Sequence, residues 1–451
     1  MRIYGEKIMI EARKILILLA MLTPLVLQAQ DEAPSQTLIT NVKIWDGVNN
    51  RLTDGSVLVE GNMIKQVGGN VSAPGAKVVD GGGRTLMPGL IDMHSHLCVQ
   101  EGLAEGKTAF DQMAMGAFTA HVMLDYLDQG FTTARDAGCN ILGVAKAVNQ
   151  GRVPGPRLYP SGGFLSQTGG HADTGNFNDQ PGYTDDLERH GFGYIVDGVA
   201  EARRAARQNF RAGATQIKMM AGGGVSSEFD PIHTTQFSEE ELRAVVEVAK
   251  DYGSYVLVHA YHDRSVNRAI DAGVKVIEHN FLVSEDTIKR MKKEGVALSL
   301  QAVMSLEAFA DPESITFFSP DQKQKASQVN AGAKQMIGWA FEHDLLIVTG
   351  GDMFGKAYVG RQADNLRIIP KEIDGVTPYQ VLKTATSDAA TVLSWSGGMN
   401  PYKYGTLGTI AEGGYADIIL VDGNPLEDLD TLVRDNVHFV MKDGTVYKNE
   451  L

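Results

Sequence analysis

The middle of this 451-residue chain alternates short apolar runs with longer stretches in which apolar residues recur at helical spacing. The eight runs read LMPGLIDMH, FTTARDAG, RLYPSGG, GATQIKMMAGG, SYVLVHAY, VKVIEHN, VALSLQ and LLIVTGGD. One intervening stretch, SEEELRAVVEVAKDYG, opens with a Ser238-x-x-Glu241 pattern that is typical of a capping box at a helix N-terminus. Eight strands alternating with helices predict an α/β fold, a (β/α)8 TIM barrel, over residues 87–402.

Both ends of the chain have another pattern, in which short alternating runs are separated by Asp-Gly and Glu-Gly turns. Such runs are typical of antiparallel strands and hairpins. We expect residues 36–86 and 403–451 to assemble one small β-sandwich domain from both termini.

The first thirty residues differ from the rest. Arg13 and Lys14 precede an apolar run from Ile15 to Leu27, and the small residue Ala29 follows it. This order is typical of a secretory signal peptide, here residues 1–29, and the run is shorter than the roughly 20 residues that span a bilayer. We expect cleavage near residue 29 and an exported, periplasmic protein without a stable membrane anchor.

The net charge of −14 argues against nucleic acid or an anionic membrane surface as a partner. The partner that we expect is a small-molecule or dipeptide substrate. The two cysteines, Cys98 and Cys139, each follow a predicted strand end. An exported protein can bridge them, but two free buried thiols fit the sequence equally well. The oligomeric state, including a homo-oligomer, also stays open.

Active sites of TIM barrels lie at the carboxyl ends of the strands. Six chemistry-bearing residues are predicted there: His94, His96, Lys218, His259, His279 and Asp352. The His-x-His pair is notable because alternate side chains of a strand point to the same face. Each residue alone has an ordinary explanation, such as a hydrogen-bonded histidine or a solvated lysine, but six at one rim predict a metal site.

The ligand types specify this site further. Imidazoles and a carboxylate suit Zn²⁺ best and also tolerate Mn²⁺ or Co²⁺. Lys218 is the unusual member, because an ammonium beside a metal ion would be repelled. A lysine among cations has a lowered pKa, and its neutral amine can add CO₂ to become a carbamate that bridges two metals.

The segments MPGLIDMHSHL, QIKMMAGGGV, VLVHAY, VKVIEHN and TGGD, in this order, resemble the metal-dependent amidohydrolase superfamily. The flanking ADIILVDGNPL and VHFVMKDGTVY match it too, and within it the chain is similar to the imidazolonepropionase-related branch that holds Xaa-Pro dipeptidase-like and ochratoxin-type amidohydrolases. The resemblance implies a dinuclear site. His94, His96 and Asp352 would hold one metal, His259 and His279 the other, and carboxylated Lys218 would bridge them.

The resemblance also implies cleavage of the non-cyclic amide bond of a dipeptide or N-acyl amino acid by a metal-bridged hydroxide. Asp352 would act as general base and then as general acid. His171, in SQTGGHAD, matches a family position that would stabilise the oxyanion. Tyr261, two residues beyond His259, is a candidate for substrate binding, with simple packing as its alternative.

Two rival functions remain. The same scaffold serves cyclic amidohydrolases and lactonases, and a decayed scaffold would be a non-catalytic exported binding protein, although all six expected ligands are present. Two further expectations concern the surroundings of the site. Arg135 and Asp136 are expected to form a structural ion pair at the rim, and residues 221–237 a flexible lid.

Overall fold

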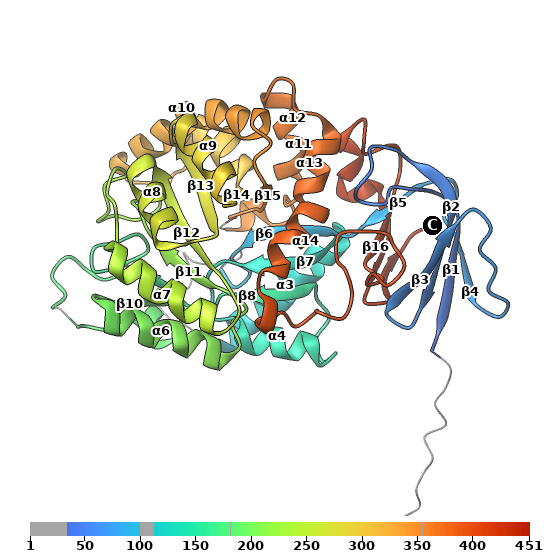
Figure 1. Ribbon diagram of the computed structural model, residues 1–451, viewed down its shortest axis with the longest axis horizontal. Helices are drawn as coiled ribbons and strands as arrows, with labels where there is room; N and C mark the ends of the chain where they lie inside the picture. Colours follow the sequence, from blue (N-terminus) through green and yellow to red (C-terminus); the bar gives the residue numbers. More distant parts are fainter. Residues whose placement is uncertain (1–33, 100–111, 181, 354) are drawn as a thin grey trace, which may run out of the picture. The chain divides into compact units, whose positions relative to one another are not determined.

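Eight parallel strands form the barrel, and they coincide with the eight apolar runs of the sequence (Figure 1). They are β6 (Leu90–Ser95), β7 (Phe131–Asp136), β8 (Arg157–Pro160), β11 (Ile217–Met220), β12 (Val256–His262), β13 (Val276–Leu282), β14 (Ala297–Leu300) and β15 (Ile347–Thr349). The computed structural model describes residues 34–99, 112–180, 182–353 and 355–451. The predicted signal peptide, residues 1–29, lies outside the described residues.

Hydrogen bonding runs in parallel register along β6, β7 and β8 and along β11 to β15. Two short strands, β9 (Phe164–Ser166) and β10 (Gly193–Ile195), lie between these groups, and β9 pairs with β11. The end of β15 meets β6 where the Asp352 amide donates to the His94 carbonyl at 2.7 Å. The predicted barrel is confirmed, and this last contact already joins two predicted site residues.

Helices connect the strands and cover the outside of the barrel (Figure 1). They are α3 (Gln112–Asp128), α4 (Leu142–Asn149), α5 (Asp186–Arg189), α6 (Val199–Ala212), α7 (Glu239–Asp251), α8 (Asp263–Ala272), α9 (Glu285–Glu294), α10 (Pro320–Glu342), α11 (Asp364–Arg367), α12 (Ile369–Glu372), α13 (Pro378–Thr384) and α14 (Ser387–Ser394). The expected capping box is present, since the Ser238 side chain accepts from the Glu241 amide and the reciprocal bond also forms. In the part of the chain that the structure describes, no helix combines the length and apolar character of a membrane span.

Strands from both ends of the chain share one eight-stranded sheet with a hydrophobic core of its own. They are β1 (Gln36–Ile44), β2 (Thr53–Glu60), β3 (Met63–Gly68), β4 (Lys77–Asp80), β5 (Thr85–Pro88), β16 (Ile418–Val421), β17 (Val437–Lys442) and β18 (Thr445–Asn449). The expectation of antiparallel pairing throughout is wrong, because β4 and β5 both run parallel to β1. The stretch between β3 and β4 returns the chain to the start of β1. There β4 pairs with residues 37–40 of β1, and β5 pairs with residues 43–44 further along the same strand.

Arg157 of β8 joins the barrel to this sheet. Its buried guanidinium donates to Asp417 at 2.7 and 3.1 Å and to Asp443 at 2.7 Å. It also lies over the rings of Tyr415, at 3.9 Å, and Tyr402, at 4.9 Å. Removing any one of these groups would leave a buried charge without its partners, so the stability of this junction depends on all of them.

We therefore predict that Arg157→Met lowers the free energy of unfolding by about 3–5 kcal/mol, because it leaves the buried Asp417 carboxylate unpaired. Urea unfolding followed by fluorescence measures this. Arg243→Ala is the control, because Arg243 pairs with Glu239 on the exposed face of α7 and its loss should cost below about 0.5 kcal/mol. Equal effects of the two substitutions would contradict the prediction.

Candidate metal centre

The two histidines of the His-x-His pair are held by their Nδ1 atoms. His94 Nδ1 lies 2.6 Å from a Glu278 carboxylate oxygen, and His96 Nδ1 lies 2.7 Å from the Gly138 carbonyl oxygen. A carboxylate and a carbonyl can only accept, so both Nδ1 atoms carry the hydrogen. The Nε2 atoms of the neutral rings therefore present lone pairs.

These lone pairs converge with a carboxylate. The two Nε2 atoms lie 3.2 Å apart, and Asp352 Oδ1 lies 3.4 Å from His94 Nε2 and 3.2 Å from His96 Nε2. Three electron-rich atoms this close repel one another unless a cation lies between them. Ligands placed tetrahedrally about 2.0–2.2 Å from Zn²⁺ are about 3.3–3.6 Å apart, so the donor set fits such an ion.

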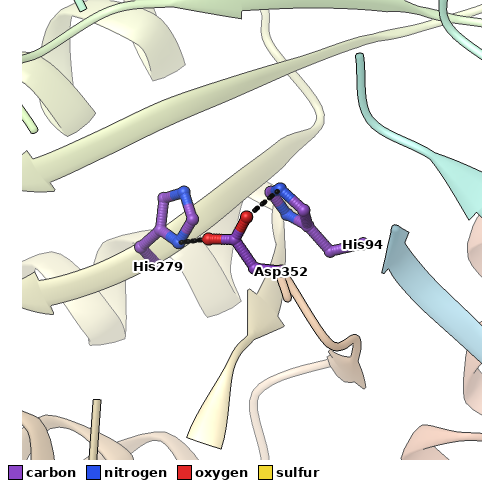
Figure 2. A group of neighbouring side chains, drawn as sticks. All are labelled: His94, His279 and Asp352. Carbon is purple, nitrogen blue, oxygen red and sulfur yellow. Dashed lines mark ion pairs between the residues drawn. The ribbon is translucent and has the colours of Figure 1, made fainter. Parts of the chain in front are cut away.

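Asp352 also faces a second pair of histidines. Its Oδ2 atom lies 3.8 Å from His279 Nδ1, so one carboxylate contacts His94 and His279 on opposite sides (Figure 2). The rings of His259 and His279 have centroids 4.5 Å apart. His259 Nε2 lies 3.1 Å from the Gly223 carbonyl oxygen, which can only accept, so Nε2 carries the hydrogen. The lone pair of this ring is therefore on Nδ1.

The charges of the cluster act on one another. Burial and the nearby Lys218 hold the pKa of His94 well below its usual value, and burial lowers the pKa of His279 to about 4. Burial alone would also lower the pKa of His96, but the Asp352 carboxylate facing its Nε2 atom raises it, because the carboxylate attracts positive charge to that nitrogen. Burial alone would raise the pKa of Asp352, but His94 and the neighbouring histidines lower it strongly. The carboxylate therefore stays ionised and attracts positive charge to this point.

Lys218 is buried within β11, as the second residue of the strand. Burial lowers the pKa of its ammonium to about 8, although Glu278 and Asp352 act in the opposite direction. Its charge in turn lowers the pKa values of His94, His259 and His279, so it acts on both histidine groups. A buried amine with a pKa near neutrality has an accessible nucleophilic form.

The backbone at the site adopts conformations that L-residues disfavour. His279, Asn280 and Asp352 have φ angles of +74°, +65° and +49°. A Cβ on Gly350 would lie 2.1 Å from the His94 amide nitrogen, so only glycine permits this approach of β15 to β6. Left-handed non-glycine residues cost about 1–3 kcal/mol each and concentrate at functional sites.

Sequence reasoning missed Glu278, which forms the interior support of the cluster. Arg135 Nη2 donates to it at 2.5 Å, so the expected ion pair between Arg135 and Asp136 is wrong. Successive residues of β7 point to opposite faces, which sends Arg135 into the barrel and Asp136 towards the loops. The sequence feature that could have revealed Glu278 is its position: a charged residue within the apolar run VKVIEHN, directly before His279.

We predict that Glu278→Gln weakens metal affinity by about 10–100-fold, because a carboxylate that orients a ligand histidine also raises its basicity. Competition of the apoprotein with a chromogenic chelator measures the affinity. The control is Glu285→Gln, at an ion-paired position on the surface of α9 that does not contact the cluster. The prediction fails if both variants bind metal like the parent.

His171 and Tyr261 both lie against the second histidine pair. The His171 ring stacks on His259 with centroids 4.0 Å apart and planes at 17°. The Tyr261 ring packs at 4.9 Å from His259 and 5.5 Å from His279. The predicted residues thus gather at one end of the barrel, while their assigned roles stay predictions.

Residues 221–237, expected to form a flexible lid, are closely tied in the structure. The Gly223 amide donates to the Thr234 carbonyl at 3.1 Å, and the Gln236 amide to the Ala221 carbonyl at 2.8 Å. Gln322 of α10 also donates to the Ser226 carbonyl. This segment is a pinned hairpin rather than a loose flap.

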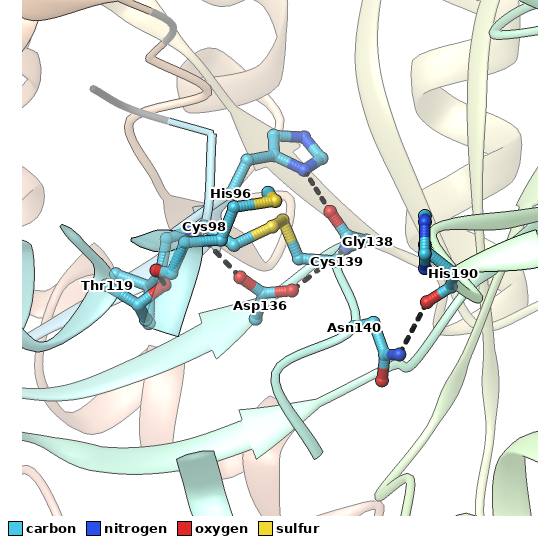
Figure 3. The surroundings of a disulfide bond; sticks show 10 residues. His96, Cys98, Thr119, Asp136, Gly138, Cys139, Asn140 and His190 are labelled. Carbon is cyan, nitrogen blue, oxygen red and sulfur yellow. Dashed lines mark hydrogen bonds between the residues drawn. A yellow bond between two sulfur atoms is a disulfide. The ribbon is translucent and has the colours of Figure 1, made fainter. Parts of the chain in front are cut away.

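Cys98 and Cys139 form a disulfide, which settles the alternative left open by the sequence (Figure 3). It joins the loops after β6 and β7. The Asp136 carboxylate links the same loops by accepting from the Leu97 amide at 2.9 Å and the Gly138 amide at 3.3 Å. The disulfide therefore flanks both His96 and the Gly138 carbonyl that orients it.

We predict that the double variant Cys98→Ser/Cys139→Ser loses about 4 kcal/mol of stability, the loop-closure entropy of its 41-residue separation. It should also release metal to a chelator faster, because the Gly138 carbonyl is held less firmly against His96. Thermal unfolding and chelator-release rates measure the two effects. The parent protein reduced with dithiothreitol lacks the bond but keeps both thiols, so it is the control for serine substitution itself. Release rates equal to those of the oxidised parent would contradict the link to His96.

Comparisons with known proteins agree with this architecture. Residues 85–447 match the model of the amidohydrolase family. Ochratoxinase of Aspergillus niger is 32% identical over 452 residues, covering 94% of this chain and 89% of that protein. A prolidase solved in complex with N-methylphosphonate-L-proline has a TM-score of 0.83 at 32% identity, and a Xaa-Pro dipeptidase with bound methionine has a TM-score of 0.81 at 30% identity. Each covers 92% of this chain and 100% of the solved one. The chain therefore belongs to the amidohydrolase family and is a hydrolase that acts on carbon–nitrogen bonds.

Proposed function

We propose that this protein is a dinuclear metal-dependent hydrolase that cleaves the amide bond of a dipeptide or an N-acyl amino acid. The observation that carries the proposal is the convergence of His94 Nε2, His96 Nε2 and Asp352 Oδ1 within 3.2–3.4 Å of one another. The similarity to a prolidase crystallised with a phosphonate of L-proline and to ochratoxinase supports an amide substrate with an amino-acid part.

The chain offers ligands for two divalent cations, with Zn²⁺ the best fit to imidazole and carboxylate donors. His94, His96 and Asp352 would hold one, and His259 and His279 the other. Lys218, carboxylated by CO₂, would supply the anionic bridge between them. When bound, such a pair of ions polarises a carbonyl and lowers the pKa of water.

The protein's own groups complete the chemistry. The Asp352 carboxylate lies between the two histidine groups and is ionised at neutral pH. It would take the proton of the attacking water and pass it to the leaving nitrogen. His171 would donate to the developing oxyanion of the substrate carbonyl. Burial raises the pKa of Tyr261, so its hydroxyl stays protonated and can donate to a substrate oxygen.

We place this activity outside the cytoplasm, after removal of residues 1–29. The disulfide between Cys98 and Cys139 supports the placement, because disulfides persist in oxidising compartments such as the periplasm.

The test joins metal content with a substrate panel. We expect two metal ions per chain by elemental mass spectrometry, and hydrolysis of Xaa-Pro dipeptides or N-acyl amino acids. Lys218→Ala should lose most of the metal and at least about 100-fold in activity, with partial rescue by short carboxylic acids that replace the bridge. Lys250→Ala, on the exposed surface of α7, is the matched control.

Other results would decide against parts of the proposal. One metal per chain with full activity would overturn the dinuclear site. Hydrolysis confined to cyclic amides or lactones would overturn the substrate class. No metal uptake from Zn²⁺ and bicarbonate, together with no hydrolysis, would favour a binding protein.

A further inference from the structure

A buried carboxylate next to the metal centre contacts no candidate metal ligand. Asp230 belongs to the pinned hairpin of residues 221–237, and its side chain is 0% exposed. Its Oδ2 atom accepts from the Gly224 amide at 2.7 Å and lies 3.0 Å from His171 Nδ1. Its Oδ1 atom makes no hydrogen bond to the residues that the structure describes.

Asp230 is an expensive group to keep in this place. A buried carboxylate with an unsatisfied oxygen loses much of its hydration without full compensation. Within the described part of the chain, the lysine that faces this carboxylate is Lys325 of α10. Its Nζ lies 3.9 Å from Oδ1 and donates to the Ser227 and Asp230 carbonyls. Such a costly group is better explained by what it does to His171 than by stability.

The His171 ring is fixed on several sides. Ser227 Oγ also lies 2.7 Å from its Nδ1, and the ring stacks on His259. Its backbone amide donates to Gln236. A Cβ on Gly224 would lie 2.1 Å from the ring's Cε1 atom, so the ring rests on a position that only glycine leaves open.

The contacts also select which ring nitrogen faces outward. A carboxylate only accepts, so His171 Nδ1 must carry the hydrogen that it donates to Asp230. Every hydrogen bond of the ring to the described residues is made by Nδ1. Nε2 is thus the edge that remains for a substrate.

We propose that Asp230, held by Lys325, is a positioning residue that fixes the orientation of His171 so that its Nε2 edge meets the substrate carbonyl oxygen as negative charge develops. This inference rests on the proposed function, because it assigns a support to the oxyanion group of the same site. Asp230, on the loop after β11, would thus hold His171, on the loop after β9, through the contact between Oδ2 and Nδ1.

The kinetic test uses the metal-loaded enzyme and a double-mutant cycle. Asp230→Asn should lower kcat/KM by about 10–100-fold, mainly through kcat, with metal content unchanged. His171→Asn should lose as much or more, and the double variant should lose no more than His171→Asn alone. Asp321→Asn is the matched control, because Asp321 contacts Lys325 from an exposed position, and it should behave like the parent.

A second variant covers the case in which Asp230→Asn fails to fold. Gly224→Ala keeps the carboxylate and Lys325 but displaces the His171 ring, and it should show the same loss in kcat, again without a further effect in the His171→Asn background. Full additivity, or an unchanged kcat in Asp230→Asn and Gly224→Ala, overturns the proposal.

A third measurement does not depend on activity, so failure of the proposed function can be told from failure of this inference. Long-range ¹H–¹⁵N spectra of histidine-labelled protein, with His171→Asn to assign the signal, should show a protonated Nδ1 in His171. Asp230→Asn should change that signal, and Asp321→Asn should leave it unaltered. A His171 ring protonated on Nε2 alone would overturn the inference even if the enzyme cleaves amides.

Discussion

The arrangement of the metal centre depends on the Glu278 carboxylate inside the barrel. It is completely buried, and it contacts Arg135 of β7 and His94 of β6 from its own place on β13. Three strands that are distant in sequence are thus brought together by one anion. Because an unpaired charge here would cost several kcal/mol, the strands can only pack with Arg135 and His94 in their observed positions. The next residue of β13 is His279, so this contact also places the second histidine group.

Backbone strain is tolerated around this support. His279 and Asp352 have left-handed conformations where their side chains approach one another, with Nδ1 and Oδ2 3.8 Å apart, whereas the left-handed Asn280 turns its amide to Met291 of α9. Such conformations persist only where the surroundings over-determine them. The closed barrel supplies that surrounding, because the Asp352 amide itself donates to the His94 carbonyl. The bond that closes the barrel and the approach of two candidate ligands are therefore the same feature.

The sequence predicts most of this architecture for identifiable reasons. The eight strands were visible because strands buried on both faces leave uninterrupted apolar runs. The rim residues were visible because parallel strands end on one side of a barrel. Glu278 and Asp230 were not, because a polar contact between distant strands depends on register that no local pattern records. The parallel pairing of β4 and β5 with β1 was missed for a similar reason, and the disulfide stayed open because sequence separation does not give a distance between Cα atoms.

Four histidines of the site are each held through one ring nitrogen by an acceptor of the protein, which leaves the other nitrogen exposed to the site. His94, His96 and His171 are each held through Nδ1, by Glu278, the Gly138 carbonyl and Asp230, and each presents Nε2. His259 is held in the opposite sense, through Nε2 to the Gly223 carbonyl, and presents Nδ1. The choice of acceptor has chemical consequences, because a carboxylate makes the opposite nitrogen more electron-rich than a neutral carbonyl does. Of these four histidines, His94 and His171 have anionic supports: His94 is a candidate metal ligand, and His171 stacks on His259 of the second histidine group. Glu278 and Asp230 therefore each act on a different ring of the site, one that faces the metal position and one that lies beside the second group.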